Sequence, residues 1–372
     1  MTLNHAAMLL SPSTPLMVQQ RTMPVPGPNQ LLIRTKAVAI NPSDWKMQQT
    51  KKDMPCILGS DVAGTVEAIG PFQSDQSTFQ KGNRVAAFAG GAWSGVLDQG
   101  GFQAFVVVSS SSTILLPANV SFESGATIPM AAATAASALW NTLGLPKPDI
   151  RGATEIKLHM QSESDPNFKL HRTGILVYGA STAVGLMTIQ MARNLGLIVF
   201  AVASKKHKGY ICSLGAHYFF AREEGDLVEA VTQAALEANL DEPLRLGLDA
   251  VSQPNSILNS VAILEGCCTM VSSTISHEFQ RKTAKLAITL DWPQHIAQSH
   301  TVTVERTSAS HFHINEENAR WLFHSYLKEG LQEASVRPVP PIRIVGSGLE
   351  SVQSALIMCE QGVSCQKLIV QV

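Results

Sequence analysis

The sequence predicts an α/β protein that combines a small β-rich domain with a doubly wound parallel sheet. The first observation is a glycine-bounded turn, at residues 179–185, which separates a short apolar strand from a helix-periodic run. The second is the alternation of strands and helices that continues after this turn. The third is the density of short strands and glycines over residues 1–117, which is typical of a compact, barrel-like β domain.

The glycine-bounded turn is typical of a dinucleotide-binding unit. Residues 175–178 and 198–203 are short apolar runs, expected to be strands buried on both faces, and the periodic run between them predicts a helix that ends at Gly196. The turn reads Gly179-Ala180-Ser181-Thr182-Ala183-Val184-Gly185. We expect a pyrophosphate at this helix N-terminus. The alternative is an ordinary strand–helix–strand unit in which these residues only turn the chain.

The end of the second strand bears on the choice of dinucleotide. NAD sites place Asp or Glu there to accept from the ribose 2′-OH, whereas this sequence has Ser204, Lys205, Lys206, His207 and Lys208. This window holds a hydroxyl and three ammonium groups but no carboxylate, which favours a 2′-phosphate and hence NADPH. The alternative is a solvated basic helix start.

Composition limits the class of partner and the compartment. The 372 residues are enough for two domains, and 28 basic against 29 acidic residues favour neither nucleic acid nor a membrane surface. The six cysteines lack C-x-x-C spacing, as expected in a reducing compartment. Because the start of the chain lacks the pattern of a signal peptide and no apolar run is long enough to span a membrane, we expect a cytoplasmic protein.

Further elements are expected at fixed places along the chain. The expected strands are residues 30–40, 100–108, 114–117, 246–251, 269–273, 342–345 and 367–372. The expected helical segments are residues 126–143, 315–329 (capped by Gly330) and 349–361. Residues 147–172 are expected to be a surface loop or insertion and 291–315 to be irregular. Ser272 and Ser273, at the end of the 269–273 strand, would lie beside a bound nicotinamide.

Several motifs resemble the medium-chain dehydrogenase/reductase superfamily along the whole chain, in its zinc-free, quinone-oxidoreductase-like branch. They are Asn41-Pro42-Ser43-Asp44, Leu58-Gly59-Ser60-Asp61-Val62-Ala63-Gly64, Lys81-Gly82-Asn83-Arg84-Val85, the turn at 179–185, Leu214-Gly215-Ala216 and Lys367-Leu368-Ile369-Val370. Within this branch, residues 37–47 and 143–146 are similar to fungal trans-acting enoyl reductases, which serve polyketide synthases or polyketide–peptide hybrid synthases.

The resemblance implies a domain organisation and a set of site residues. Residues 1–140 and 325–372 would form a GroES-like substrate domain and residues 141–324 a Rossmann NADPH-binding domain, with the active site in the cleft between them. Zinc is excluded because Asn41 and Ser60-Asp61 replace the Cys and His-Glu of zinc members. The implied cofactor-binding residues are Asn41, Pro42, Ser43, residues 179–185, Ser204, Lys205, Lys208, Tyr218, Ser272, Ser273 and Lys367.

Two side chains are candidates for the chemistry itself. Without a metal, donors in the site must stabilise the negative charge that develops on a thioester oxygen during enoyl reduction. Lys46 follows the loop at 41–44 and is the first candidate, although a solvated surface lysine is the alternative. Thr134 is a candidate donor to the nicotinamide, or else it bonds back to its own helix. Asp44 and Asp61 are expected to make structural hydrogen bonds, and His311 and His313 to be loop histidines.

Three functions follow from these observations. The first is an NADPH-dependent enoyl reductase acting in trans on a polyketide chain bound to an acyl carrier protein. The second is a stand-alone quinone or enone reductase acting on free small molecules. The third is a family member without redox activity that serves as a cyclase or synthase partner, a reading kept open by Thr182-Ala183 in place of glycines. A monomer and a homodimer are both compatible with the sequence; in a dimer, residues 302–306 would be the edge strand.

Overall fold

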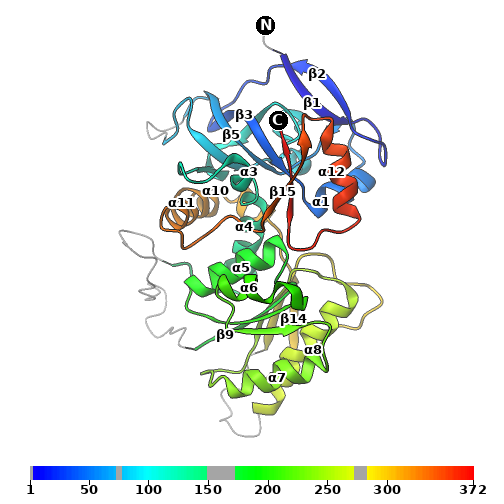
Figure 1. The fold of residues 1–372 in the computed structure, drawn as a ribbon, viewed down its shortest axis with the longest axis vertical. Coiled ribbons are helices and arrows are strands. Elements are labelled where there is room, and N and C mark those ends of the chain that lie inside the picture. The colour runs from blue at the N-terminus through cyan, green and yellow to red at the C-terminus, as the bar shows by residue number, and fades with distance from the viewer. Residues whose placement is uncertain (1–2, 73–77, 149–171, 272–282) are drawn as a thin grey trace. The chain divides into compact units, whose positions relative to one another are not determined.

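A computed structural model describes residues 3–72, 78–148, 172–271 and 283–372 (Figure 1). The chain divides into two compact units, Met1–Ala131 with Phe312–Val372, and Ala132–His311. The domain boundaries expected from the sequence stay a prediction, and so does the loop at 147–172, most of which lies outside the described residues. Within the described ranges, no helix has both the length and the apolar character needed to cross a membrane.

The first unit is organised around a seven-stranded sheet in which β3 is the central strand. The strands of its main path are, in spatial order, β15 (Ile342–Ser347), β16 (Lys367–Gln371), β3 (Gln30–Ala39), β5 (Asp61–Ile69), β6 (Arg84–Phe88) and β8 (Thr113–Leu115). On one edge of β3, β7 (Phe105–Ser109) pairs with the first half of the strand and β16 pairs with the second half. The red C-terminal strand β16 therefore lies beside the blue β3 in Figure 1. Among the described strands this pairing does not close, so the barrel-like domain expected from the sequence is an open sheet.

Shorter elements complete the first unit. A second sheet has the strand order β2 (Met17–Thr22), β1 (Leu3–Leu9) and β4 (Cys56–Ile57). The helices and helical turns are α1 (Pro42–Thr50), α2 (Gly91–Ser94), η1 (Leu97–Gln99), η2 (Ser110–Ser112), α3 (Phe122–Gly125), α10 (Glu316–Arg320), η6 (Trp321–Tyr326), α11 (Leu327–Gln332) and α12 (Ser351–Glu360). Two further helices, α4 (Pro129–Ala136) and α9 (Ser310–Ile314), span the divisions between the units.

The second unit is a six-stranded sheet in which all strands run parallel. Its strands are, in spatial order, β11 (Tyr218–Ala221), β10 (Ile198–Ala203), β9 (Gly174–Tyr178), β12 (Leu246–Asp249), β13 (Ala284–Ile288) and β14 (Val302–Arg306). Its helical segments are η3 (Ser137–Thr142), α5 (Ala183–Asn194), η4 (Lys205–His207), α6 (Lys208–Ser213), α7 (Leu227–Glu237) and α8 (Pro254–Val271). This order confirms the predicted doubly wound sheet.

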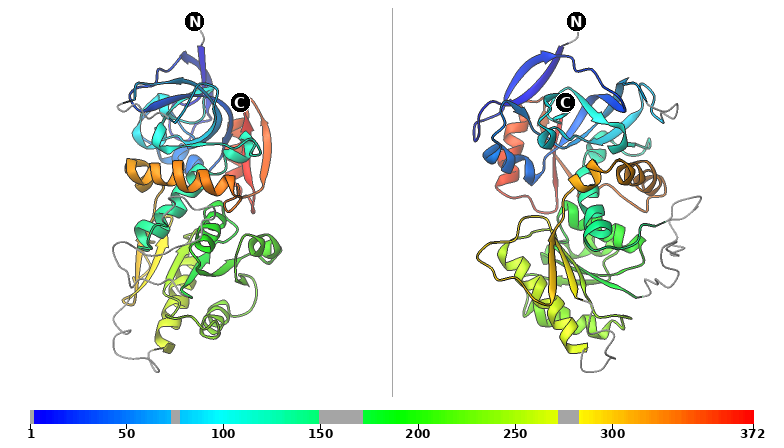
Figure 2. Two further views of the ribbon diagram at one scale, coloured as in Figure 1. Left: turned by 90° about the vertical axis from the view of Figure 1, so that its left-hand side faces the viewer. Right: turned by 180° about the vertical axis from the view of Figure 1, so that it is seen from behind.

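Helices cover both faces of this parallel sheet (Figures 1 and 2). Leu176 and Phe200 share a core with Leu227 of α7 and Leu264 of α8, while α5 packs against β9 and β10. Every residue of β9 is buried, which explains its uninterrupted apolar sequence. The strand order changes direction between β9 and β12, so the carboxyl ends of these two strands mark the place where such sheets bind ligands.

Several expected elements were wrong. Thr269 is in α8, which continues to Val271, so residues 269–271 are not a strand, and Ser272 and Ser273 lie outside the described residues. The short apolar run at 267–271 has no period of its own and continues a helix that begins at Pro254. The next strand is instead β13. The region 291–315 contains β14 and α9, and the helical run after Asn315 passes through Gly330 to Gln332.

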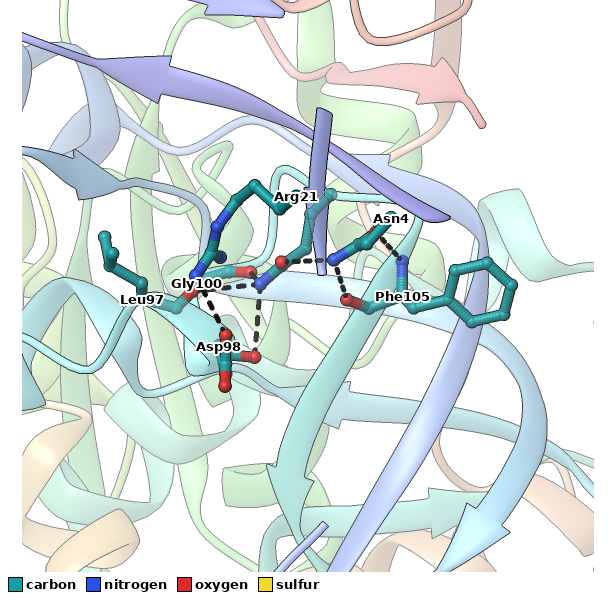
Figure 3. A network of polar contacts seen from close by, with 7 residues as sticks. Asn4, Arg21, Leu97, Asp98, Gly100 and Phe105 are labelled. Carbon is teal, nitrogen blue, oxygen red and sulfur yellow. Dashed lines mark hydrogen bonds and ion pairs between the residues drawn. The ribbon is translucent and has the colours of Figure 1, made fainter. Parts of the chain in front are cut away.

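The strand expected at 100–108 begins only at Phe105, because an inward-turned amide network precedes it (Figure 3). The Gln103 amide donates to the carbonyls of Leu97, Asp98 and Gly100 at 3.1, 3.1 and 2.6 Å. Its oxygen accepts from the Asn4 amide at 2.9 Å. Asn4 also accepts from the Phe105 N–H at 2.9 Å and donates to the Phe105 carbonyl at 3.0 Å. Asn4 and Gln103 are fully buried, so this network fixes β1 against β7.

We expect Asn4→Ala to lower the free energy of unfolding by about 2–3 kcal/mol, because it leaves the Phe105 backbone groups and the Gln103 oxygen buried without partners. The measurement is urea unfolding of the two proteins. His5→Ala, at the exposed neighbouring position of β1, is the control and should change the same quantity by less than about 0.5 kcal/mol. Equal stability of the two variants would show that the network does not hold β1.

Candidate functional site

A buried polar cluster lies where β3 ends in the first unit. The Lys367 ammonium donates to Oδ1 of Asn41 and to Oδ2 of Asp61, the latter at 3.1 Å. The Asn41 amide donates to the same Asp61 oxygen at 2.8 Å. All three side chains are buried, and they begin or follow three different strands: Asn41 follows β3, Asp61 begins β5 and Lys367 begins β16. Because the charges are paired and hydrogen-bonded, their burial is tolerated, and the cluster joins the three strand ends.

The two carboxylates of this region make structural hydrogen bonds, as expected. Oδ1 of Asp61 accepts from the N–H of Met130, near the start of α4, at 2.7 Å. Asp44, in the first turn of α1, accepts from the Asn41 N–H at 2.8 Å and so closes the start of that helix. The pKa of Asp44 is raised to about 7, mainly by burial and in smaller part by the charge of Asp61, against the lowering effect of the Asn41 N–H.

Lys46 is half-buried rather than a freely solvated surface lysine. Its Nζ lies 5.5 Å from the centroid of the Trp45 ring. Burial lowers the pKa of the Lys46 ammonium, and the neighbouring Cys359, on α12, acts in the opposite direction. The pKa of the Cys359 thiol is raised to about 11, mainly by burial. Lys46 is therefore a half-buried ammonium with Trp45 of its own helix and Cys359 of α12 as neighbours, in the same unit as the Asn41 cluster.

The other members of the predicted loop differ in exposure. Pro42 is exposed at the start of α1, and Ser43 is half-buried with its hydroxyl 3.7 Å from the Met130 sulfur. The Lys367 ammonium donates to Asn41 and Asp61 and so positions the Asn41 side chain in this structure. Roles of these residues in cofactor binding stay predictions.

In the second unit, two glycines and a threonine N-cap shape the turn at 179–185 between β9 and α5. Gly179 has a φ of 76°, and a Cβ there would lie 2.6 Å from a methyl of Val251, in the loop after β12. A Cβ on Gly185 would lie 2.4 Å from the Gly179 carbonyl oxygen, so only glycine lets α5 start this close to β9. Thr182 is the N-cap of α5, and its hydroxyl accepts from the Gly185 N–H at 3.0 Å.

This turn fits a dinucleotide pyrophosphate. Ser181, Thr182, Ala183 and Val184 are all partly exposed, while Ala180 is buried beneath them. Ala183 and Val184 are in the first turn of α5, where backbone N–H groups have no carbonyl partner within the helix. An anion is a suitable partner for such N–H groups. Thr182 in place of a glycine is therefore compatible with the turn, because its side chain caps the helix and does not obstruct the N-terminus.

Sequence reasoning missed a network at the carboxyl end of β12. Asp249 accepts from the N–H groups of Val251 and Ser252 at 2.8 and 2.9 Å, and from the Ser256 hydroxyl at 2.6 Å. The Ser252 hydroxyl accepts from the Thr289 N–H at 2.7 Å, which ties this loop to the end of β13. Burial raises the pKa of Asp249. The available signal was an aspartate that ends an apolar strand and is followed by two serines at short spacing.

The basic segment after β10 has acidic neighbours that the sequence window did not contain. Lys205 forms an ion pair with Glu224, and its backbone N–H donates to Glu223 at 3.3 Å. Lys206 and Lys208 are exposed, and Ser204 is partly exposed. Residues 204–208 themselves contain no carboxylate, but Glu223 and Glu224, from the loop after the neighbouring strand β11, lie beside these donors.

The remaining predicted residues belong to separate elements of the two units. The Tyr218 ring is stacked on Phe200, with centroids 4.7 Å apart, inside the β10–β11 layer. Thr134 is buried on α4 in the second unit, whereas Lys46 belongs to the first. His311 and His313 are in different units and bond different serines, Ser137 and Ser112, as structural histidines do. Within the described residues, no group of three His, Cys, Asp or Glu side chains has the arrangement of a metal site.

Comparison with known proteins places this architecture. Residues 27–118 match the alcohol dehydrogenase GroES-like domain family. A mycobacterial protein complexed with NADPH has the same fold, with a TM-score of 0.68 and 19% identity over 100% of both chains.

Two curated fungal proteins are similar in sequence. A trans-enoyl reductase from Aspergillus flavipes is 30% identical over 99% of this chain and 98% of its own. A trans-enoyl reductase from Aspergillus terreus is 36% identical over 63% of this chain and 74% of its own. The chain belongs to the medium-chain dehydrogenase/reductase superfamily and, within it, to the family of these fungal trans-enoyl reductases, which confirms the resemblance seen in its motifs.

The raised pKa of Asp44 predicts a pH-dependent stability. The folded state holds the proton up to pH about 7, whereas the unfolded chain releases it near 3.8. This stabilisation is complete below the unfolded pKa and is lost as pH rises through 7. Asp44→Asn keeps an acceptor for the Asn41 N–H but has no charge. As pH rises from 5 to 8, we expect the free energy of unfolding of this variant to increase by about 2–3 kcal/mol relative to that of wild type.

Urea unfolding at the two pH values measures this difference. Asp53→Asn, at an exposed aspartate of the same unit, is the control and should follow the pH dependence of wild type. If Asp44→Asn also follows wild type, the carboxyl is ionised in the folded protein throughout this range.

Proposed function

We propose that this protein is an NADPH-dependent enoyl reductase that acts in trans on an α,β-unsaturated polyketide thioester held by an acyl carrier protein. The observation that carries the proposal is the turn at 179–185, whose two glycines and open helix N-terminus are shaped for a dinucleotide. The family supports the reaction class, because relatives that match along the chain are named trans-enoyl reductases. The similar mycobacterial fold complexed with NADPH supports the choice of a nicotinamide cofactor.

The residues of the turn would hold the cofactor, and the basic segment would select it. The N-terminus of α5 binds the pyrophosphate, while Ser204, Lys205 and Lys208 bind the 2′-phosphate. Bound NADPH supplies the hydride that reduces the β-carbon of the enoyl group. Gly179 and Gly185 would keep the turn tight enough for this N-terminus to face the pyrophosphate. The carboxyl ends of β9 and β12, held by the Asp249 network, form the floor of this site.

Lys46 is the residue of this chain proposed to act on the thioester. During reduction, negative charge develops on the carbonyl oxygen, and a partly desolvated ammonium stabilises that charge more strongly than a solvated one. The Asn41–Asp61–Lys367 cluster positions the start of α1, which carries Lys46. The reaction is proposed to need no zinc, because Asn41 and Asp61 offer neither thiolate nor imidazole and are hydrogen-bonded to each other and to Lys367.

Cofactor titration and turnover test this function together. The purified protein is titrated with NADPH and NADH by nicotinamide fluorescence, and NADPH should bind more tightly. NADPH oxidation is then followed with a but-2-enoyl thioester on an acyl carrier protein and, separately, with free benzoquinone. Reduction of the carrier-bound thioester alone supports the proposal. Reduction of the quinone alone would identify a stand-alone reductase, and binding of neither dinucleotide would refute a redox role.

Lys46→Met tests the role of the ammonium. It keeps the length and apolar stem of the side chain but removes the charge, so we expect kcat for the carrier-bound thioester to fall roughly 10- to 100-fold. The Kd of NADPH should stay within about twofold, since the proposed partner of Lys46 is the thioester. Lys52→Met, at an exposed lysine two residues after α1, is the control and should retain wild-type kcat. Retained kcat in Lys46→Met would remove Lys46 from the mechanism.

A further inference from the structure

The donors at the end of β10 already hold a carboxylate of the protein itself. Oε2 of Glu223 accepts from the Lys205 N–H at 3.3 Å. The Ser204 hydroxyl also hydrogen-bonds the Glu223 carboxylate, and this bond is the main reason why the pKa of Glu223 lies below its usual range. Ser204 and Lys205 are two of the three residues assigned above to a ribose 2′-phosphate. The Glu223 carboxylate therefore contacts two of the residues proposed to hold that phosphate.

The sheet brings this contact about. β10 and β11 are parallel neighbours, and Ala203 is paired with Ala221 at their carboxyl ends. The Arg222 N–H donates to the Ala203 carbonyl at 3.0 Å, which extends the pairing by one more residue. The chains that follow, starting at Ser204 and Arg222, leave the sheet at the same edge. The approach of Glu223 to Ser204 is thus a consequence of strand register, and not only of one side-chain rotamer.

The charges around Glu223 determine how its carboxylate would affect the binding of a phosphate. Glu223 has an ion pair with Arg222, whose Nε lies 3.3 Å from Oε1, and Lys205 has one with Glu224. Two of the cations available for a phosphate are therefore already paired with carboxylates. A 2′-phosphate meets repulsion from Glu223 and must displace it from Ser204 and Lys205. A 2′-hydroxyl, in contrast, can donate a hydrogen bond to the same carboxylate.

We propose that Glu223 sets the cofactor selectivity of this protein, acting as an internal competitor of the 2′-phosphate at the Ser204 and Lys205 donors. The proposal rests on the dinucleotide site of the proposed function and adds the residue that tunes it. It implies that the wild-type protein binds NADPH less tightly than it would without the Glu223 carboxylate. The difference in affinity between NADPH and NADH is therefore smaller than the donors and cations of the site alone would give.

Glu223→Gln tests the proposal, because the amide keeps the size of the side chain and removes the anion. Dissociation constants of NADPH and NADH are measured by nicotinamide fluorescence at low ionic strength. We expect the Kd of NADPH to fall about three- to fivefold, as for partly exposed charges, while the Kd of NADH is unchanged or rises. High salt should shrink the difference because it screens the carboxylate. Thermal unfolding of each protein checks that the fold is retained.

Glu305→Gln is the matched control. Glu305 is an exposed glutamate of β14, at the opposite edge of the same sheet, so its substitution changes the net charge equally. The ratio of its dissociation constants for NADPH and NADH should equal that of wild type.

The outcomes separate this inference from the function on which it rests. An unchanged ratio of the two dissociation constants in Glu223→Gln would overturn the inference and show that Glu223 has no effect on selectivity. Weaker NADPH binding would also overturn it and show that Glu223 supports the site. Failure of all three proteins to bind either dinucleotide would overturn it as well. A ratio shifted toward NADPH without any turnover of the enoyl thioester would uphold the role of Glu223 and refute only the proposed reaction.

Discussion

The buried interaction of Lys367 with Asn41 and Asp61 is the constraint on which the first unit depends. Lys367 and Asn41 are 326 positions apart in the chain, yet the Lys367 ammonium donates to Asn41 and forms an ion pair with Asp61 at 3.1 Å. An unpaired charge in this interior would cost several kcal/mol, so the ends of β3, β5 and β16 must meet for the unit to fold. The same contact fixes where α1 begins, and with it the Asp44 cap and the Lys46 ammonium. One ion pair therefore links the architecture of the sheet to the proposed chemistry.

The second unit depends on a different constraint, the register of its parallel sheet. Parallel strands bring their carboxyl ends to one edge, so the loops after β9, β10, β11 and β12 become neighbours whatever their sequences. The glycines at 179 and 185 let one of these loops turn tightly so that α5 starts close to β9, and the Asp249 network ties another to the end of β13. Register also explains how Glu223 reaches Ser204. A site of this kind is assembled by strand order first and refined by side chains afterwards.

Much of this organisation could be predicted from the sequence wherever neighbouring residues in the chain determine the local structure. The strand, turn and helix at 174–194 were predicted because glycine, helix period and a buried apolar run agree with each other there. The end of α8 was mistaken for a strand, since a short apolar run has no period that separates the two. The carboxylates beside Ser204 were missed because they come from a different strand, and the partner of Asn41 is visible in the sequence only through a family motif. What the sequence hides is the set of contacts made by tertiary pairing.

The central claim is that this chain transfers a hydride from NADPH to an enoyl thioester, and isotope transfer tests it most directly. NADPH carrying deuterium at C4 on the transferred face is incubated with the protein and a but-2-enoyl group on an acyl carrier protein, and the product is examined by mass spectrometry and NMR. The account predicts one deuterium at the β-carbon of the saturated thioester. A saturated product without deuterium at that carbon, or consumption of NADPH without a saturated thioester, would contradict it.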